Sequence, residues 1–163
     1  MDGLDLPVDP MRRGDPAARV ERTRAQLAAL VEQGLWSPDP AVDELLDDGA
    51  RLPPPAAEPV LAHGDLHVRH LLLDDDLGAA GVIDWGDVCL ADPAVDLAMA
   101  YAAFVGPARA ALLDAYGGVD AERELRARCL AVRLSALLAG YAAADDRPTL
   151  LTEALTGIGR AVA

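Results

Sequence analysis

The sequence contains no lysine and no asparagine, and all 14 of its basic residues are arginine. Without lysine there is no Walker A motif, because that phosphate-binding loop requires a Lys beside its glycines. Aromatic residues make up only 4% of the chain, which disfavours a β-sandwich. Ala and Leu supply most of the 52% hydrophobic content, which favours closely packed helices. Residues 1–163 therefore fit a single domain with a sizeable core.

Cysteine is equally scarce, since Cys89 and Cys129 are the only two in the chain. Two isolated cysteines cannot build a disulfide framework or a zinc ribbon, so we expect reduced thiols and a cytoplasmic location. The first residues lack the basic and apolar parts of a signal peptide. We also expect no membrane partner, because no apolar run in the sequence approaches the length of a membrane span.

Acidic residues outnumber basic ones by 27 to 14, which gives a formal net charge of −13. This balance argues against nucleic acid as a partner, because neutralising phosphates needs a basic surface. An acidic surface can attract cationic small molecules, so a cationic small-molecule partner is one expectation. Solubility alone is a sufficient explanation of the same charge.

Helix-capping residues, and apolar residues at helical spacing, predict that most of the chain is helical. The predicted helices cover residues 16–34, 39–50, 92–104, 107–117, 120–140 and a last segment that begins at Thr149. Residues 71–74 and 80–84 predict two short strands joined by a turn at 75–78, and residues 85–91 predict a loop. The expected fold is therefore α+β and mainly helical, with the helices packed on one side of a small β-hairpin.

Polar motifs flank this hairpin, where ordinary strand ends would not place them. His-Gly-Asp-Leu-His occupies residues 63–67, Val-Ile-Asp-Trp-Gly-Asp residues 82–87, and Asp-Pro-Ala-Val-Asp residues 92–96. Asp65 precedes the first strand and Asp84 follows the second, so the two carboxylates can converge on one point. Such a point suits a metal-bound phosphate and the hydroxyl that attacks it.

The three motifs, in this order over residues 63–98, resemble the aminoglycoside phosphotransferase and choline kinase family, which is protein-kinase-like. The resemblance implies the carboxy-terminal lobe of that fold and transfer of the γ-phosphate of ATP or GTP to a hydroxyl of a small molecule. Asp65 matches the catalytic Asp, which orients the hydroxyl and accepts its proton. Asp84 matches the metal-binding Asp, whose hard oxygens suit Mg²⁺. The resemblance also implies that Asp96 holds the main-chain amides of the loop around Asp65.

His70 departs from the family pattern, which has an Asn at this position to bind a second metal ion. Imidazole nitrogen is a softer ligand, better suited to Mn²⁺ or Zn²⁺ than to Mg²⁺. Three roles for His70 stay open: a ligand of a different ion, a hydrogen-bond partner of Asp84, or a substitution that leaves one metal ion in the site. His63 matches a structural histidine, and His67 is expected to support the loop or face solvent.

The amino-terminal lobe of such a kinase is not recognisable in the sequence. There is no G-x-G-x-x-G loop and no Lys on a strand, both of which act on the donor phosphates. We therefore expect a truncated part of a longer kinase, inactive alone, or a chain complemented by another polypeptide. The lobe face left exposed is expected to favour self-association.

Two other functions compete with phosphoryl transfer. The first is a metal-dependent hydrolase, in which the metal ligands would be His63, Asp65, His67, His70 and Asp84. The second is a non-catalytic lobe that binds a small molecule or a partner protein.

Overall fold

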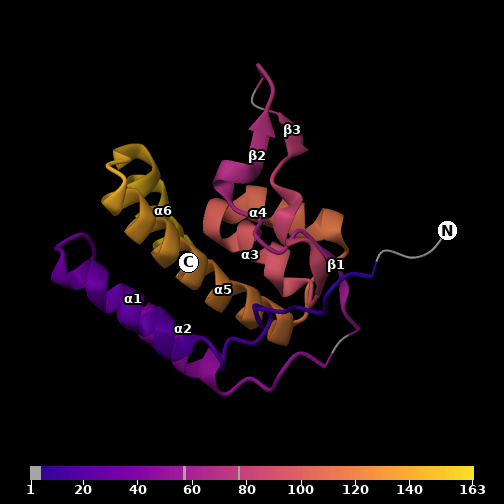
Figure 1. The fold of residues 1–163 in the computed structure, drawn as a ribbon, viewed down its shortest axis with the longest axis horizontal. Helices are drawn as coiled ribbons and strands as arrows, with labels where there is room; N and C mark the ends of the chain where they lie inside the picture. The colour runs from indigo at the N-terminus through magenta and orange to yellow at the C-terminus, as the bar shows by residue number, and fades with distance from the viewer. Residues whose placement is uncertain (1–4, 57, 77) are drawn as a thin grey trace.

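The structure is a computed structural model that describes residues 5–56, 58–76 and 78–163. The described residues form helices and two small antiparallel sheets, so the expectation of a mainly helical α+β fold is confirmed (Figure 1). The helices are α1 (Val20–Glu32), α2 (Pro40–Ala50), α3 (Ala94–Ala103), α4 (Gly106–Tyr116), α5 (Ala121–Ala144) and α6 (Pro148–Val162). The strands are β1 (Val60–Ala62), β2 (Leu71–Leu73), β3 (Ala79–Val82) and β4 (Cys89–Ala91).

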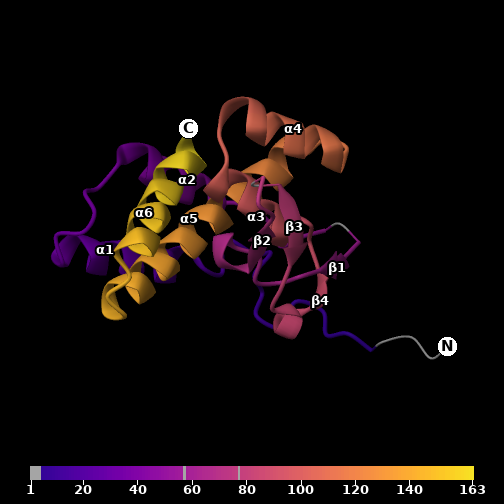
Figure 2. The same cartoon turned by 90° about the horizontal axis from the view of Figure 1, so that it is seen from above.

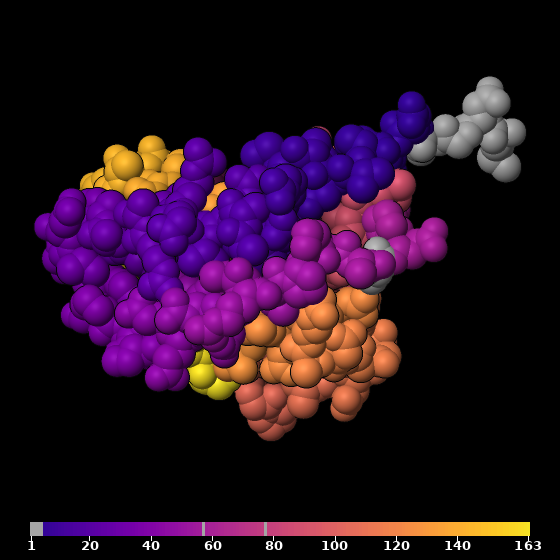
Figure 3. Space-filling view, turned by 90° about the horizontal axis from the view of Figure 1, so that it is seen from below, coloured from indigo at the N-terminus to yellow at the C-terminus, as the bar shows by residue number. Residues whose placement is uncertain are grey.

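Helix α5 is the centre of the core and contacts α1, α2, α3 and α6. It runs between α1 and α2 on one side and α3 on the other (Figures 1 and 2). The space-filling view in Figure 3 shows residues 5–56 lying across much of this side of the molecule, with later residues in orange exposed beside them. Helix α5 is therefore packed on both sides, and α3, on one of these sides, holds the loop around Asp65.

Helix α5 also carries a long apolar stretch. It is long and apolar enough to cross a membrane by length and composition, but half of its most apolar window is buried inside the protein. The sequence predicted that this helix ends near Gly140, whereas it continues to Ala144. A glycine inside a helix costs only about 1 kcal/mol relative to alanine, so packing against α6 outweighs it.

Several helix ends lie where the local signals predicted them. Asp39 accepts the Ala41 N–H at 2.9 Å and caps α2. Gly34 adopts a positive φ of 69° after α1, which glycine tolerates without strain. The start of α1 was predicted too early, because Pro16–Arg19 forms a turn and the regular helix begins at Val20.

The predicted hairpin is present, and a second pair of strands accompanies it. Strands β2 and β3 pair antiparallel with Leu71 opposite Val82. Strand β1 pairs antiparallel with β4, which lies in the segment predicted as a loop. The same segment contains a short 3₁₀ helix at Trp85–Asp87. Of the predicted turn at 75–78, residue 77 lies outside the described residues.

The β-strand end of the molecule exposes apolar side chains to solvent. Leu61 is 61% exposed, Leu73 56% and Trp85 50%. The hairpin projects away from the helices in Figure 1, so none of the described helices covers its tip. Such a surface is suited to being covered by another polypeptide. Self-association through this face stays a prediction.

Candidate functional site

The loop that carries Asp65 is fixed to the start of α3. The Asp96 carboxylate accepts the main-chain N–H groups of His63 at 2.6 Å and of Gly64 at 3.1 Å. Hydrogen bonds from amides to an ionised carboxylate are among the stronger ones in proteins. Asp96 therefore holds the amides of the loop, as the family resemblance implies. Because Asp96 belongs to α3, this helix sets the position of Asp65.

Gly64 permits a close approach of two main-chain segments beside Asp65. Its φ is +86°, and a Cβ atom at this position would lie 2.3 Å from the carbonyl oxygen of Asp87. Asp87 is held in turn by Arg13, whose guanidinium lies 2.8 Å from its carboxylate. Asp87 thus helps to hold this part of the loop in place.

The hairpin brings His70 and Asp84 together from its two strand ends. The N–H of Ile83 donates to the carbonyl of His70 at 3.0 Å, which extends the pairing of β2 and β3 by one step. Asp84 follows at once, in a left-handed conformation with φ 65° and ψ 57°. Its side chain is 68% exposed. A non-glycine residue in this region costs free energy and is found often at functional sites.

Hydrogen bonds assign the protons of the three histidines around the site. His63 Nδ1 accepts the Asp65 N–H at 3.3 Å, so its Nε2 donates to the carbonyl of Ile83 at 2.8 Å. His67 Nδ1 accepts the Arg69 N–H at 3.3 Å, which places its proton on Nε2. In neutral form, neither histidine offers a free lone pair to a metal ion.

In His70 the hydrogen bonds leave Nε2 as the nitrogen with the free lone pair. Its Nδ1 lies 2.8 Å from the main-chain carbonyl of Asp65, which can only accept, so Nδ1 carries the proton. The lone pair of neutral His70 is then on Nε2, which lies 3.4 Å from Oδ2 of Asp84. Two lone pairs at this separation repel unless a proton or a cation lies between them. A main-chain carbonyl that orients the far side of the ring is typical of metal-ligating histidines.

Asp65 and His67 complete the cluster around His70. One ligand atom from each of Asp65, His67 and His70 lies within 4.8 Å of the others. The rings of His67 and His70 are 3.8 Å apart between centroids. Burial lowers the pKa of His67, and His70 lowers it further, while the Asp65 carboxylate opposes both. His67 is therefore neutral near pH 7.

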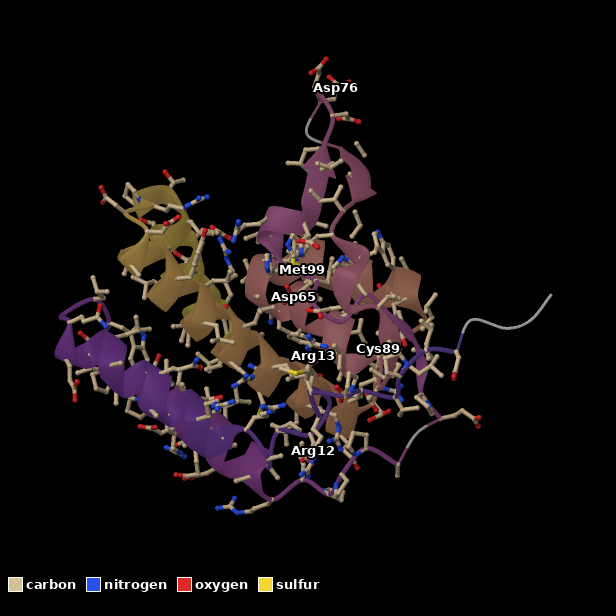
Figure 4. All side chains as sticks on the ribbon, viewed as in Figure 1. Arg12, Arg13, Asp65, Asp76, Cys89 and Met99 are labelled. Atoms are coloured by element: carbon tan, nitrogen blue, oxygen red, sulfur yellow. The ribbon has the colours of Figure 1, made fainter. Side chains whose placement is uncertain are left out.

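The structure thus brings Asp65, His70 and Asp84 to one place. Asp65 lies at the base of the hairpin and the exposed Asp76 at its tip (Figure 4). The Nε2 atom of His70 and the Asp84 carboxylate are donors that fit a divalent cation, and the exposure of Asp84 leaves room for water or phosphate. His67 supports the loop, one of the two roles expected for it, because its buried ring accepts the Arg69 N–H.

A cavity of about 180 Å³ opens beside Asp65. It is lined by Asp65 and Gly64, by residues of α3 and α5, and by the segment that precedes α1. The acidic residues of the late helices do not line it. Asp145 binds Arg147 and Tyr141, and Glu153 pairs with Arg160.

Comparison with known proteins settles the family. The sequence profile of the phosphotransferase enzyme family matches residues 3–131. The chain belongs to this family. The motifs that suggested the resemblance, residues 63–98, lie inside the matched segment.

Two similar proteins were found, and the chain aligns with only part of each. Over 56 residues it is 39% identical to the uncharacterized protein YcbJ of Bacillus subtilis (strain 168), which is 34% of this chain and 18% of that protein. The solved structure of a macrolide 2'-phosphotransferase type I aligns with 94% of this chain at 24% identity and a TM-score of 0.49. This alignment covers 50% of that phosphotransferase, so the chain spans half of its length.

Proposed function

We propose that this family member forms the acceptor and metal side of a phosphotransferase that moves the γ-phosphate of ATP or GTP to a hydroxyl of a small molecule. The lobe that covers the donor phosphates is contributed by further polypeptide, which docks on the exposed apolar end around Trp85 and Leu61. The absence of lysine from the chain supports this division, since kinases use a Lys of that lobe on the phosphates.

Asp65 orients the acceptor hydroxyl in this proposal. Asp65 lines the cavity and also belongs to the cluster with His67 and His70. A hydroxyl bound at the cavity end can donate to the carboxylate, which fixes the direction of attack and accepts the proton as the bond to phosphorus forms. Asp96 keeps the carboxylate in place through the loop amides.

Asp84 and His70 hold a divalent cation, either Mg²⁺ or Mn²⁺. When bound, such an ion neutralises charge on the donor phosphates. The His70 ring is prepared for this role because the Asp65 carbonyl fixes its tautomer. The imidazole nitrogen favours Mn²⁺ over Mg²⁺ relative to the amide oxygen of an Asn at this position.

The observation that carries the proposal is the pair of contacts made by the His70 ring, to the Asp65 carbonyl at 2.8 Å and to the Asp84 carboxylate at 3.4 Å. These contacts join the two motifs into one site. The hydrolase hypothesis is less well supported, because both ring nitrogens of His63 and the Nδ1 of His67 are already hydrogen-bonded. Zinc bound in stoichiometric amount would favour it.

Phosphate transfer from labelled ATP and GTP to a panel of hydroxyl compounds tests the proposal, with the chain assayed together with the polypeptide that supplies the lobe over the donor phosphates. Asp65→Asn is expected to lower kcat by about 10²–10⁴-fold, since it removes the base. Asp76→Asn is the matched control at the hairpin tip and leaves kcat unchanged. Undiminished turnover in Asp65→Asn contradicts the proposal. Absence of transfer from the unaltered protein, with a retained small-molecule site, favours the non-catalytic lobe instead.

A further inference from the structure

The cavity beside Asp65 is rich in arginine. Arg13 and Arg19, from the segment before α1, and Arg133 of α5 all line it (Figure 4 labels Arg13 and Asp65). Apart from these groups, Gly64 and Asp65, the lining is apolar and includes Leu130, Leu134 and Leu137 from one face of α5. The cavity thus combines positive charge, an apolar wall and one carboxylate.

Most of this positive charge has no acidic partner among the described residues. Arg13 pairs with Asp87, but no described carboxylate lies within ion-pair distance of Arg19 or Arg133. Nη1 of Arg133 and Nε of Arg19 are buried and have no hydrogen-bond partner among the described residues. Buried donors on a charged group that lack an acceptor are costly and rare in native proteins.

The same arginines disfavour one another. Burial lowers the pKa of Arg133, and the positive charges of Arg19 and Arg22 lower it further. Arg13 acts in the same direction. In a chain with a formal net charge of −13, arginines gathered without acidic partners indicate a missing anion.

We propose that this cavity binds the anionic group, a carboxylate or a phosphate, of the acceptor whose hydroxyl faces Asp65. The inference rests on the proposed function and specifies its substrate class: a small hydroxylated organic anion with an apolar portion that contacts the leucines of α5. A volume of about 180 Å³ holds such a molecule or the anionic part of a larger one.

The position of the cavity separates this anion from the donor nucleotide. Among the described residues, neither Asp84 nor His70 lines the cavity, whereas Asp65 lines it and also belongs to the histidine cluster. The arginines therefore lie on the acceptor side of Asp65. The overall acidity of the chain suggested a cationic acceptor, but the lining of the cavity favours the opposite charge.

Binding of D-glycerate and of inorganic phosphate to the full chain tests the proposal without any nucleotide or metal ion. Calorimetry gives Kd, and thermal unfolding at constant ionic strength gives a second readout. Tm is expected to rise by about 3–5 °C at probe concentrations ten times Kd. Arg133→Gln is expected to weaken binding about tenfold or more. Arg51→Gln is the control, because it removes one positive charge from an exposed pair with Asp48 and leaves binding unchanged.

Arg19→Gln is expected to weaken binding as well and replaces Arg133→Gln if that variant does not fold. Absence of probe binding to the unaltered chain, or equal binding by the cavity variants and Arg51→Gln, overturns the proposal. Displacement of glycerate by metal-free ATP also overturns it, since the arginines would then serve the donor phosphates.

Asp65→Asn separates this inference from the proposed function. It removes a negative charge from the cavity, so it is expected to bind phosphate and glycerate more tightly while it loses transfer. Tighter binding with full transfer contradicts only the catalytic role of Asp65. Unchanged binding with lost transfer contradicts only the anion site.

Discussion

His70 lies with its Nε2 3.4 Å from Oδ2 of Asp84, a distance at which a positive charge between the two atoms stabilises the contact. The other ring nitrogen donates to the Asp65 carbonyl, so neutral His70 cannot supply that charge itself. Either a second proton or a cation completes the contact. The placement of this ring between the two motifs is therefore the feature on which the proposed cation site rests.

Replacing His70 by the residue that the family pattern has here tests its role as a ligand. His70→Asn exchanges an imidazole nitrogen for an amide oxygen, so the ratio of Mn²⁺ to Mg²⁺ affinity is expected to fall by about tenfold. Competition calorimetry with the two ions measures this ratio. His67→Asn is the control, because the Nε2 of His67 carries its proton, and it leaves the ratio unchanged. An equal effect of the two substitutions refutes the assignment.

Asp96 is expected to stabilise the site loop more than an ordinary surface carboxylate does. Asp96→Asn weakens two charge-assisted hydrogen bonds to main-chain amides, so the free energy of unfolding should fall by about 1.5–3 kcal/mol. Urea unfolding measures the loss. Asp114→Asn, on the exposed side of α4, provides the comparison and should be close to neutral. Equal stability of the two variants would show that the loop is held by other contacts.

Gly64 should be irreplaceable for a reason beyond its backbone conformation. Ala at position 64 meets the Asp87 carbonyl at 2.3 Å, whereas Ala at position 118, where φ is +87°, meets nothing within 4 Å. Both substitutions incur the left-handed penalty of about 1–2 kcal/mol. Gly64→Ala is expected to cost about 1–3 kcal/mol more, because the main chain must shift. Chemical unfolding of the two variants gives this difference, and equal losses would contradict the close approach.

Cys129 provides a test of the core that is independent of the site. Cys129 belongs to α5 and its thiol is buried in the core. This burial raises the pKa of the thiol to about 12. The native protein is therefore expected to resist iodoacetamide at pH 8 and to react once unfolded. Because the folded pKa exceeds the unfolded value of 9.0, this thiol contributes to stability below pH 9. The contribution is lost as the pH rises from 9 towards 12. Rapid alkylation of the folded protein would contradict the packing around α5.

Much of the fold could be predicted from the sequence because helix caps and turns depend on only a few neighbouring residues. Asp39 before Pro40, and Gly34 and Gly117 after helices, are caps that hold regardless of tertiary contacts. The pairing of β1 with β4 has no such signal, since each strand has three residues and the two are far apart in sequence. The end of α5 was predicted too early for a related reason, because tertiary packing overrides the low helix propensity of Gly140.

The sequence indicated which residues come close together, whereas their catalytic and metal-binding roles stay predictions. Spacing indicated that Asp65 and Asp84 converge, and the hairpin brings both towards His70. Which histidine has a free nitrogen depends on main-chain carbonyls and amides that the sequence does not reveal. Arg19 and Arg133 line the same cavity although they are more than a hundred residues apart in sequence. The sequence therefore did not reveal this cluster of positive charge, and the overall acidity of the chain suggested a cationic ligand instead.

Manganese binding followed by electron paramagnetic resonance tests the central claim most directly. The unaltered chain is expected to bind one Mn²⁺, and Asp84→Asn to bind it at least about tenfold more weakly, whereas Asp76→Asn binds it as the unaltered chain does. Equal affinity of all three proteins, or no binding by any of them, would contradict the claim that His70 and Asp84 form a cation site beside Asp65.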